Sequence, residues 1–252
     1  MKHIASYILI LFLVLIVHSA MAQNADETFQ MKARVGYAVG GTTPLGMPAE
    51  IRGLDKFRVT PNFMVGFDCQ YRLSSRFGLL GGVRFEIKDM DIEATTKGYH
   101  MEVKMDDDVL DGLYTGHVRQ QVRQRMFTIP VQLTFQLSRT VTLKAGPYLS
   151  ILTCKQFEGY AFDGYLRKDD PTGSKVVMGD KEGEWATYDF GEDMRRCQFG
   201  ISAGVDWNFW RRLGLSADLS WGLTGIHHSD FKTVEQTLYP IYGTIGLFYR
   251  IK

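Results

Sequence analysis

The sequence lacks the signatures of a metal-dependent or nucleotide-dependent enzyme and of a helical membrane protein. It contains three cysteines but no CxxC pair, and no HExxH, P-loop or dinucleotide-binding motif, so we predict no metal and no cofactor. After Val17 no apolar run recurs that is long enough for a membrane-spanning helix. The formal net charge of +1 gives no reason to expect nucleic acid as a partner. Any membrane contact must therefore be made by β-strands.

The N-terminal segment has the order of a secretory leader. Lys2 precedes an apolar run from Ile8 to Val17, and Ala20-Met21-Ala22 supplies the small residues of a cleavage site. The run is short for a transmembrane anchor, which needs about 20 apolar residues. No cysteine directly follows the site, so a lipoprotein is not indicated. We predict a signal peptide at 1–22 and a single domain at 23–252.

After the leader, apolar and polar residues alternate in separate segments. In the clearest segment, 124–137, the odd-numbered residues from Phe127 to Leu137 are apolar, and most residues between them are polar. A period of two is typical of a strand with one apolar and one polar face. We predict eight strands, with approximate bounds 31–41, 62–73, 76–90, 124–137, 140–154, 196–209, 213–224 and 238–251.

The connections between the predicted strands alternate in length. Tight turns are predicted at Ser74-Ser75, Ser138-Arg139 and Trp210-Arg211-Arg212, and long loops at 42–61, 91–123, 155–195 and 225–237. Outer-membrane β-barrels combine an even strand number with short periplasmic turns and long extracellular loops. We therefore predict an all-β fold, an eight-stranded antiparallel up-and-down transmembrane β-barrel with short periplasmic turns and long extracellular loops, in the cell outer membrane of a Gram-negative bacterium.

The aromatic residues support this orientation, because they sort to the two ends of the predicted strands. Rings concentrate at both interfaces of membrane barrels, whereas a soluble barrel that encloses a ligand has no reason to sort them. We expect the apolar faces to point outward, in contact with lipid and lipopolysaccharide. The outer girdle is predicted from Phe63, Phe127, Phe199, Trp221 and Tyr239, and the inner girdle from Tyr71, Phe77, Phe135, Trp207, Phe209 and Tyr249.

The even-numbered positions of the strands carry charges of both signs. Eight strands leave an interior just wide enough to be filled by side chains, and an unpaired buried charge is costly. We predict a lumen polar network that closes the barrel, and the alternative is a narrow path for small solutes. The predicted network consists of Arg34, Asp68, Arg72, Arg84, Glu86, Lys88, Lys144, Asp206 and Asp218.

Four segments resemble a known family. Phe127–Leu133 is similar to a strand of pattern I-P-[LV]-x-L, and Leu143–Tyr148 contains Gly-Pro-Tyr; Trp221–Ile226 and Ile245–Tyr249 are similar to an x-G-L-x-x-I segment and a closing strand. In order and spacing, over 31–252, they resemble the PorT-like outer-membrane β-barrel family of Bacteroidota. The resemblance implies an eight-stranded outer-membrane barrel. The founding member works in type IX protein secretion, and most members have no assigned activity.

His227 and Ser229 are the only residues that suggest catalysis. A His-x-Ser pair near the lipid interface is similar to the catalytic pair of lipid A deacylases. Here His227 would be the general base and Ser229 the nucleophile, with Asp230 or Glu235 as the orienting acid. A polar loop is the simpler interpretation, because the preceding segment matches the barrel family's own motif. We predict no enzyme activity and keep a lipid A-modifying hydrolase as the alternative.

Two further groups of residues, an acidic cluster and a pair of cysteines, have a structural interpretation. Asp106-Asp107-Asp108 and Asp111-Gly112 lack the spacing of an EF-hand, so a solvated acidic loop is predicted. Cys154 and Cys197 flank the longest loop and could be joined by a disulfide. Their opposite parity directs them to opposite faces of the sheet unless a bulge intervenes, and the disulfide is left open. Cys69 is predicted to face lipid.

Function is expected in the long outer loops, because a rigid scaffold displays them. We predict a non-enzymatic membrane anchor, associated with secretion or the envelope, that contacts a protein or a surface glycan through 91–123 and 155–195. The aromatic residues of these two loops suit such contacts, although they would also suit a cap over the barrel mouth. They are Tyr99, Tyr114, Phe157, Tyr160, Phe162, Tyr165, Trp185 and Tyr188.

Overall fold

The computed structural model describes residues 28–46, 48–105, 108–168, 172–181, 183–228, 230–231, 233 and 236–251. The predicted signal peptide, 1–22, lies outside the described residues. Within the described ranges the chain forms twelve strands in one antiparallel sheet. No helix in those ranges is long and apolar enough to cross a membrane. The predicted all-β antiparallel fold is confirmed.

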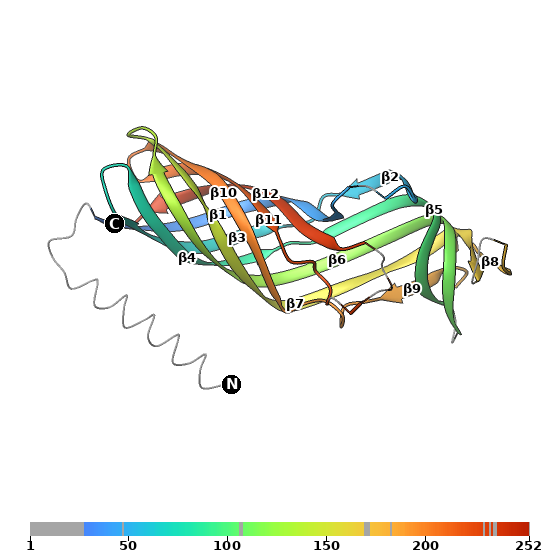
Figure 1. The fold of residues 1–252 in the computed structure, drawn as a ribbon. Helices are drawn as coiled ribbons and strands as arrows, with labels where there is room; N and C mark the ends of the chain where they lie inside the picture. Colours follow the sequence, from blue (N-terminus) through green and yellow to red (C-terminus); the bar gives the residue numbers. More distant parts are fainter. Residues whose placement is uncertain are drawn as a thin grey trace.

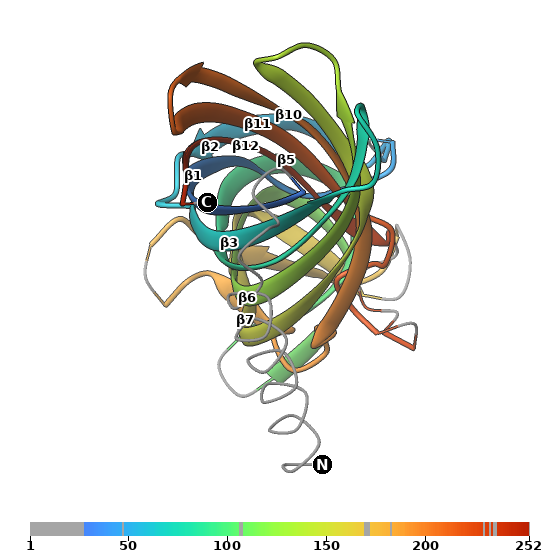
Figure 2. The ribbon, with the colours of Figure 1, turned by 90° about the vertical axis from the view of Figure 1, so that its left-hand side faces the viewer.

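Part of the sheet closes into a ring of strands, which we call the barrel wall. Each strand of the ring pairs with the next along the chain, and the last pairs with the first. Figure 2 shows this ring from the end where the C-terminus lies. In chain order its strands are β1 (Phe29–Pro44), β3 (Phe63–Arg72), β4 (Phe77–Ile87), β6 (Asp108–Gln136), β7 (Val141–Lys168), β10 (Cys197–Trp210), β11 (Leu213–Gly222) and β12 (Leu238–Arg250).

The prediction of eight strands is wrong in number, because further strands occupy segments that were expected to be loops. The segments 91–123 and 155–195, which were predicted to be long loops, consist largely of β-strands. β6 and β7 extend over 29 and 28 residues and continue to pair with each other beyond the barrel wall. The ladder satisfies the backbone N–H and C=O groups that an irregular loop would leave unpaired. The additional strands are β2 (Ile51–Arg58), β5 (Met90–Met105), β8 (Lys175–Met178) and β9 (Ala186–Asp189).

These additional strands and the far halves of β6 and β7 form a second structure, which we call the distal sheet. It comprises β2, β5, β8, β9, 108–125 of β6 and 154–168 of β7. Figure 1 shows it at the end of the molecule opposite the C-terminus. β5 pairs with β6, β6 with β7, β7 with β9, and β9 returns to β5 at Lys104 and Thr187. The distal sheet is therefore curved into a small second ring.

A β-bulge separates the barrel wall from the distal sheet on β7. Arg125 of β6 pairs with Cys154, and Met126 pairs with Leu152, so Thr153 is the additional residue. Its hydroxyl donates to the carbonyl oxygen of Arg125 at 3.0 Å. Such a bulge reverses the alternation of side chains along its strand. On β7, Leu152 points inward on the wall side, and the odd-numbered Phe157 is buried on the distal side.

In the barrel wall the odd-numbered side chains, which are mostly apolar, point outward, and the even-numbered side chains, many of them polar, point inward. Phe127 and Leu219 are 45% and 57% exposed, while Asp68 and Gln132 are completely buried. This is the expected orientation, since the water-avoiding face is on the outside of the ring. The polar face then fills the interior.

Tight turns join the strands at the end that holds the C-terminus. β3 and β4 are joined through 73–76, β6 and β7 through 137–140, and β10 and β11 through 211–212. Serine hydroxyls accept backbone N–H groups in two of them: Ser74 from Phe77 at 3.1 Å and Ser138 from Val141 at 3.1 Å. These local bonds explain the serine near the start of each of these two turns.

Candidate functional site

The part of the lumen nearer the tight turns is filled by a network centred on Asp206 of β10. Its carboxylate accepts from Lys32 at 3.0 Å, from Arg34 at 2.5 Å and from Lys144 at 2.8 Å. All four side chains are almost completely buried. Three cations from β1 and β7 therefore converge on one carboxylate in a region of low dielectric constant, where such pairs depend on complete mutual compensation.

A second carboxylate, Asp68 of β3, extends the network. It pairs with Arg34 and, at 2.9 Å, with Arg84 of β4. Lys144 also reaches Asp218 of β11 at 2.9 Å. Glycines leave the space for these groups: a β-carbon on Gly82 would collide with the Asp68 carboxylate, and one on Gly204 with that of Asp218. Charged side chains thus fill the interior, and neighbouring glycines provide the space for them.

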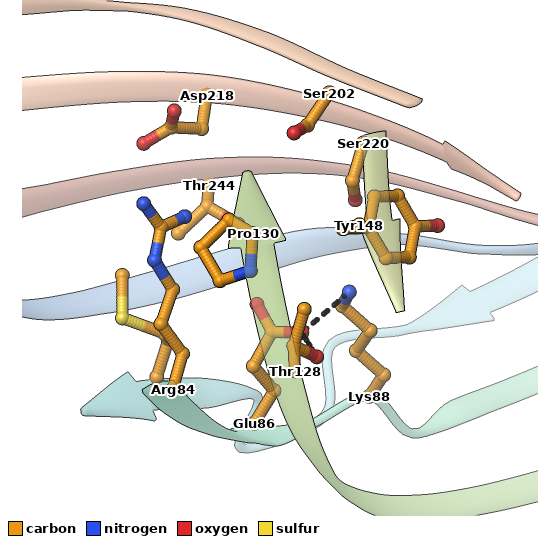
Figure 3. A pocket seen from close by; sticks show the side chains of 11 residues that line it. Arg84, Glu86, Lys88, Thr128, Pro130, Tyr148, Ser202, Asp218, Ser220 and Thr244 are labelled. Atoms are coloured by element: carbon orange, nitrogen blue, oxygen red, sulfur yellow. Dashed lines mark hydrogen bonds and ion pairs between the residues drawn. The ribbon is translucent and has the colours of Figure 1, made fainter. Parts of the chain in front are cut away.

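The part of the lumen nearer the distal sheet is closed by one ion pair and two tyrosine rings. Lys88 donates to Glu86 at 2.9 Å, and Glu86 also accepts from Thr128 at 2.6 Å, as Figure 3 shows. The Lys88 ammonium lies 5.7 Å from the ring centroid of Tyr148 and 5.5 Å from that of Tyr242. The void beside Glu86, Lys88, Thr128 and Tyr148 measures about 20 Å³, which is room for about one water molecule.

The structure brings together all but one of the predicted lumen residues. Arg72 is exposed, because it is the last residue of β3 and lies at the turn end of the wall. Its prediction as a lumen residue is wrong: alternation says nothing about how far along the barrel a residue lies. Lys32 was missed, although it is even-numbered and within the first predicted strand, so the same alternation identifies it.

The predicted girdle residues occupy opposite ends of the outward face. Phe77 pairs with Phe135 at the turn end, with ring centroids 5.2 Å apart, and Phe85 contacts both Phe63 and Phe127 at the other end. Phe135 and Tyr239 are half-buried. The remaining girdle residues are exposed: Phe63, Tyr71, Phe77, Phe127, Phe199, Trp207, Phe209, Trp221 and Tyr249.

The distal sheet has an apolar interior, unlike the lumen. Its core includes Val122 of β6, Phe157 and Leu166 of β7 and Tyr188 of β9, each nearly or completely buried. The Tyr188 hydroxyl donates to the carbonyl oxygen of Arg119 at 3.1 Å. Burial raises the pKa of Tyr188, so this phenol stays neutral. Several aromatics expected to be available for contacts are thus core residues, namely Tyr114, Phe157 and Tyr188.

An open apolar cavity lies between the distal sheet and the rim of the barrel wall. Its volume is about 410 Å³. Its walls include Met90 and Met101 of β5, Phe157 of β7 and Leu238 of β12. This volume is within the range of about 300–1,000 Å³ found for small-molecule sites.

The outer surface of the distal sheet carries a network of ion pairs. Asp91 accepts from Arg119 at 2.7 Å and from Arg58 at 3.1 Å, and Glu93 accepts from Arg58 at 2.5 Å and Lys56 at 2.8 Å. The hydrogen bond from Arg119 holds the pKa of Asp91 below its usual range. These pairs connect β2 to β5 and β6 on a water-facing surface.

The two candidate catalytic residues are not both described, since Ser229 lies outside the described residues, as does Glu235. His227 packs edge-on against Phe157 at 4.7 Å and stacks on Phe231 at 4.5 Å. Burial, together with the charges of His228 and Lys155, lowers its pKa to about 4. The ring is therefore part of an aromatic cluster, and Asp230 is exposed.

The cysteine and aspartate predictions have simple outcomes. Cys69, Cys154 and Cys197 are all free, so the disulfide does not form; Cys197 pairs with Ile151, whereas Cys154 pairs with Arg125 on the other side of β7. Asp106 and Asp107 lie outside the described residues. Asp108 and Asp111 belong to β6, so this end of the predicted acidic loop is strand instead. Among the described residues no metal-binding cluster occurs.

Comparison with known proteins identifies a family. The family model for the outer membrane protein beta-barrel domain matches 21–228. No curated protein matches the chain. Among solved structures, Ail of Yersinia pestis, the attachment invasion locus protein, is 12% identical with a TM-score of 0.36, and the match covers 89% of this chain and 99% of that chain.

Two other solved structures have similar values. Neisserial surface protein A (NspA) is 12% identical with a TM-score of 0.32, covering 88% of this chain and 96% of that chain. The outer membrane protease OmpT of Escherichia coli is 11% identical with a TM-score of 0.31, covering 89% and 94%. These scores are too low to support an inference about function.

The family match and the fold together locate the protein. The matched segment is most of the chain, and the ring of strands carries its apolar face on the outside. The protein is located in the outer membrane of a Gram-negative bacterium. The chain belongs to the family of outer-membrane proteins defined by this β-barrel domain.

Proposed function

We propose that this protein is a non-enzymatic outer-membrane anchor. In this proposal the eight strands of the barrel wall span the bilayer with a closed lumen. The distal sheet then stands outside the cell as a rigid platform that contacts a protein or a surface glycan. The proposal includes the narrower relationship to PorT-like barrels, which the segments Phe127–Leu133 and Leu143–Tyr148 support, and with it a role in secretion or the envelope.

The observation that carries the proposal is the change of polarity along β6. Facing outward, the odd-numbered residues from Phe127 to Leu133 are apolar, and those on the distal side of Phe127 are polar: Arg125, Arg123, Gln121 and Arg119. Arginines at this level suit a boundary with anionic lipid headgroups. The same boundary supports an assignment of the distal sheet to the extracellular side, where chain connections of outer-membrane barrels are long.

The packed lumen favours an anchor over the alternative of a small-solute pore. Buried ion pairs cross the lumen at Asp206 and Asp68. Above them Lys88 is held against Glu86 and two tyrosine rings. A solute would have to separate these charges, which is costly in a dry interior.

A surface suited to a partner lies on the outer side of the distal sheet, and we call it the aromatic patch. It consists of His117, Arg119, Tyr160, Phe162 and Trp185. Tyr160 stacks on Trp185 at 4.8 Å and lies 5.4 Å from Phe162, and Arg119 donates to the Tyr160 hydroxyl at 3.2 Å. Tryptophan, tyrosine and arginine dominate binding energy at protein interfaces, and these side chains are already held in place.

The environment of His227 supports a non-enzymatic role over lipid A hydrolysis. A general base works best with a pKa near the operating pH, whereas burial lowers the pKa of His227 to about 4. Its ring is held between Phe157 and Phe231. The hydrolase hypothesis predicts a changed lipid A mass spectrum in a Ser229→Ala strain, and the anchor proposal predicts an unchanged one.

The contact proposal is tested by substitution within the aromatic patch. Cells of the native host expressing the full-length protein are treated with a membrane-impermeant cross-linker, and linked species are identified by mass spectrometry. The Tyr160→Ala/Trp185→Ala variant should lose the linked partner. A matched control, Val109→Ala/Val177→Ala, changes two exposed side chains of the distal sheet and should retain it. Equal recovery from the patch variant, or no linked species from the wild type, would contradict the proposal.

A further inference from the structure

The cavity of about 410 Å³ is not explained by the anchor role, and its walls have an unusual composition for an exposed region. Among the described residues, no charged side chain lines it. The polar residues in the lining are threonines, glutamines and tyrosines. Apolar residues, among them Met90, Met101, Phe157 and Leu238, form much of the surface. Such a lining excludes ions and charged peptides as ligands, because no charge of opposite sign would compensate them there.

Small residues keep the cavity open. Gly41 and Thr42 of β1 and Ala94 and Thr96 of β5 line it where larger apolar residues would fill it. At the near end the space is already tight, since a β-carbon on Gly41 would lie 2.6 Å from the sulfur of Met90. Protein interiors are otherwise close-packed, and an empty apolar cavity forfeits dispersion contacts. A ligand that fills this space would restore them.

A bulge on β5 builds the wall of the cavity. Inward positions are even-numbered from Met90 to Thr96, and odd-numbered from Met101 onward, because Gly98 is the extra residue opposite β6. Its φ of +65° is a conformation that favours glycine. The bulge therefore keeps uncharged side chains facing the cavity on both sides of Gly98, from Met90 to Met101.

The cavity extends from the membrane level to an opening at β2. At its lower end Ile241 lines it, and Ile241 pairs with Trp221 of the outer girdle. At its open side Leu54 and Phe57 of β2 line it and are 52% and 43% exposed. Figure 1 shows β2 and β5 beyond the ends of β1 and β12. An apolar chain could therefore reach the cavity from the bilayer or from outside.

We propose that this cavity is a binding site for the acyl chain of an amphiphile, a lipid or a free fatty acid. The uncharged walls would hold the hydrocarbon, and the charged head would remain in solvent or among headgroups. The cavity lies against the inner face of the distal sheet, and the aromatic patch lies on its outer face, so this proposal does not depend on partner contact through that patch.

The test uses the unmodified full-length protein in nanodiscs of a single phosphatidylcholine. One arm adds palmitic acid with a photoreactive diazirine in its chain, and the other carries the diazirine in an acyl chain of the phospholipid. Labelling of peptides that contain Met101 or Tyr188 is expected. The arm that labels them identifies the source, free acid or bilayer lipid. Labelling confined to the lipid-facing wall, such as 127–135, in both arms would overturn the proposal.

Matched variants show whether the labelled molecule occupies the cavity. Ala94→Phe and, independently, Val118→Phe fill it from β5 and β6 and should weaken labelling of the Met101 peptide by about tenfold or more. Val109→Phe adds the same side chain at an exposed position and should leave labelling unchanged. Heat-modifiable gel migration checks that each variant is folded. Undiminished labelling in a folded Ala94→Phe or Val118→Phe protein would place the ligand elsewhere and overturn the proposal.

Discussion

The barrel wall and the distal sheet share two strands but have opposite interiors. In the wall, β6 and β7 turn Gln132, Thr128 and Lys144 inward and apolar residues outward. In the distal sheet the same strands bury Val122, Phe157 and Leu166, and the outer face carries ion pairs such as Arg119 with Asp91. One continuous ladder thus passes from a polar interior to an apolar one.

This comparison shows that the surroundings, and not the strand, determine which side chains are buried. Where lipid surrounds the ring, apolar side chains lose nothing by facing out, and the interior must be made of compensated charges. Where water surrounds it, burying apolar surface stabilises the structure in the ordinary way. The two regions should therefore respond differently to the same kind of substitution.

The largest effect is expected from breaking the charge network of the lumen. Asp206→Asn leaves Lys32, Arg34 and Lys144 without their shared carboxylate and should lower the free energy of unfolding by about 3–5 kcal/mol. Urea titration followed by gel migration of folded and unfolded forms measures it. Lys56→Ala removes an exposed ion pair with Glu93 and should cost less than about 1 kcal/mol. Similar losses for both would contradict the contrast between buried and exposed pairs.

A cavity made in the distal core should act locally. Leu166→Ala truncates a completely buried side chain and should destabilise the distal sheet by about 2–5 kcal/mol. We expect faster proteolysis within 108–125 and 154–168, measured by mass spectrometry of the fragments, with an unchanged heat-modifiable barrel. Val177→Ala, at an exposed distal position, is the control. Loss of the folded barrel in Leu166→Ala would show that the two regions unfold together.

The smallest expected effect is a pH dependence confined to the distal sheet. His227 titrates at about 4 when folded, against 6.5 ordinarily, so between these values the unfolded chain binds a proton that the folded chain does not. The contribution of His227 to the free energy of unfolding is fully present above about pH 6.5. It falls as the pH decreases toward 4, by about 1–2 kcal/mol after allowance for the partial exposure of the ring. Proteolysis rates across this window measure the loss. His227→Phe should reduce it, and an unchanged profile would exclude His227 as the source.

Much of the barrel wall follows from alternation in the sequence. Each predicted strand overlaps a wall strand, and the tight turns at Ser74-Ser75 and Ser138-Arg139 fall within observed ones. The distal parts of β5 and β7 were not predicted, because the extra residues Gly98 and Thr153 change the phase of the alternation on these strands. The distal part of β6 keeps its phase, but the all-polar run Arg119-Gln120-Gln121 interrupts its alternation of apolar and polar residues.

The site was predictable where it depends on which face a residue occupies, and not where it depends on depth or contacts. Parity places Asp206 and Arg84 in the lumen, and the same rule wrongly included Arg72 at the end of β3. The pairing of Lys144 with two carboxylates depends on strand register. The cavity depends on small residues from β1 and β5, which lie far apart in sequence.

The extra residue at Thr153 has a consequence for how such a molecule can diversify. It shifts the alternation of side chains along β7 by one residue. The distal sheet can therefore turn its apolar residues inward, while the barrel wall keeps its apolar residues outward, toward lipid. Distal sheets of different length or shape could then be exchanged on the same barrel wall, provided that the extra residue is kept. Deleting that single residue would turn Phe157 and its neighbours out into water without altering any side chain.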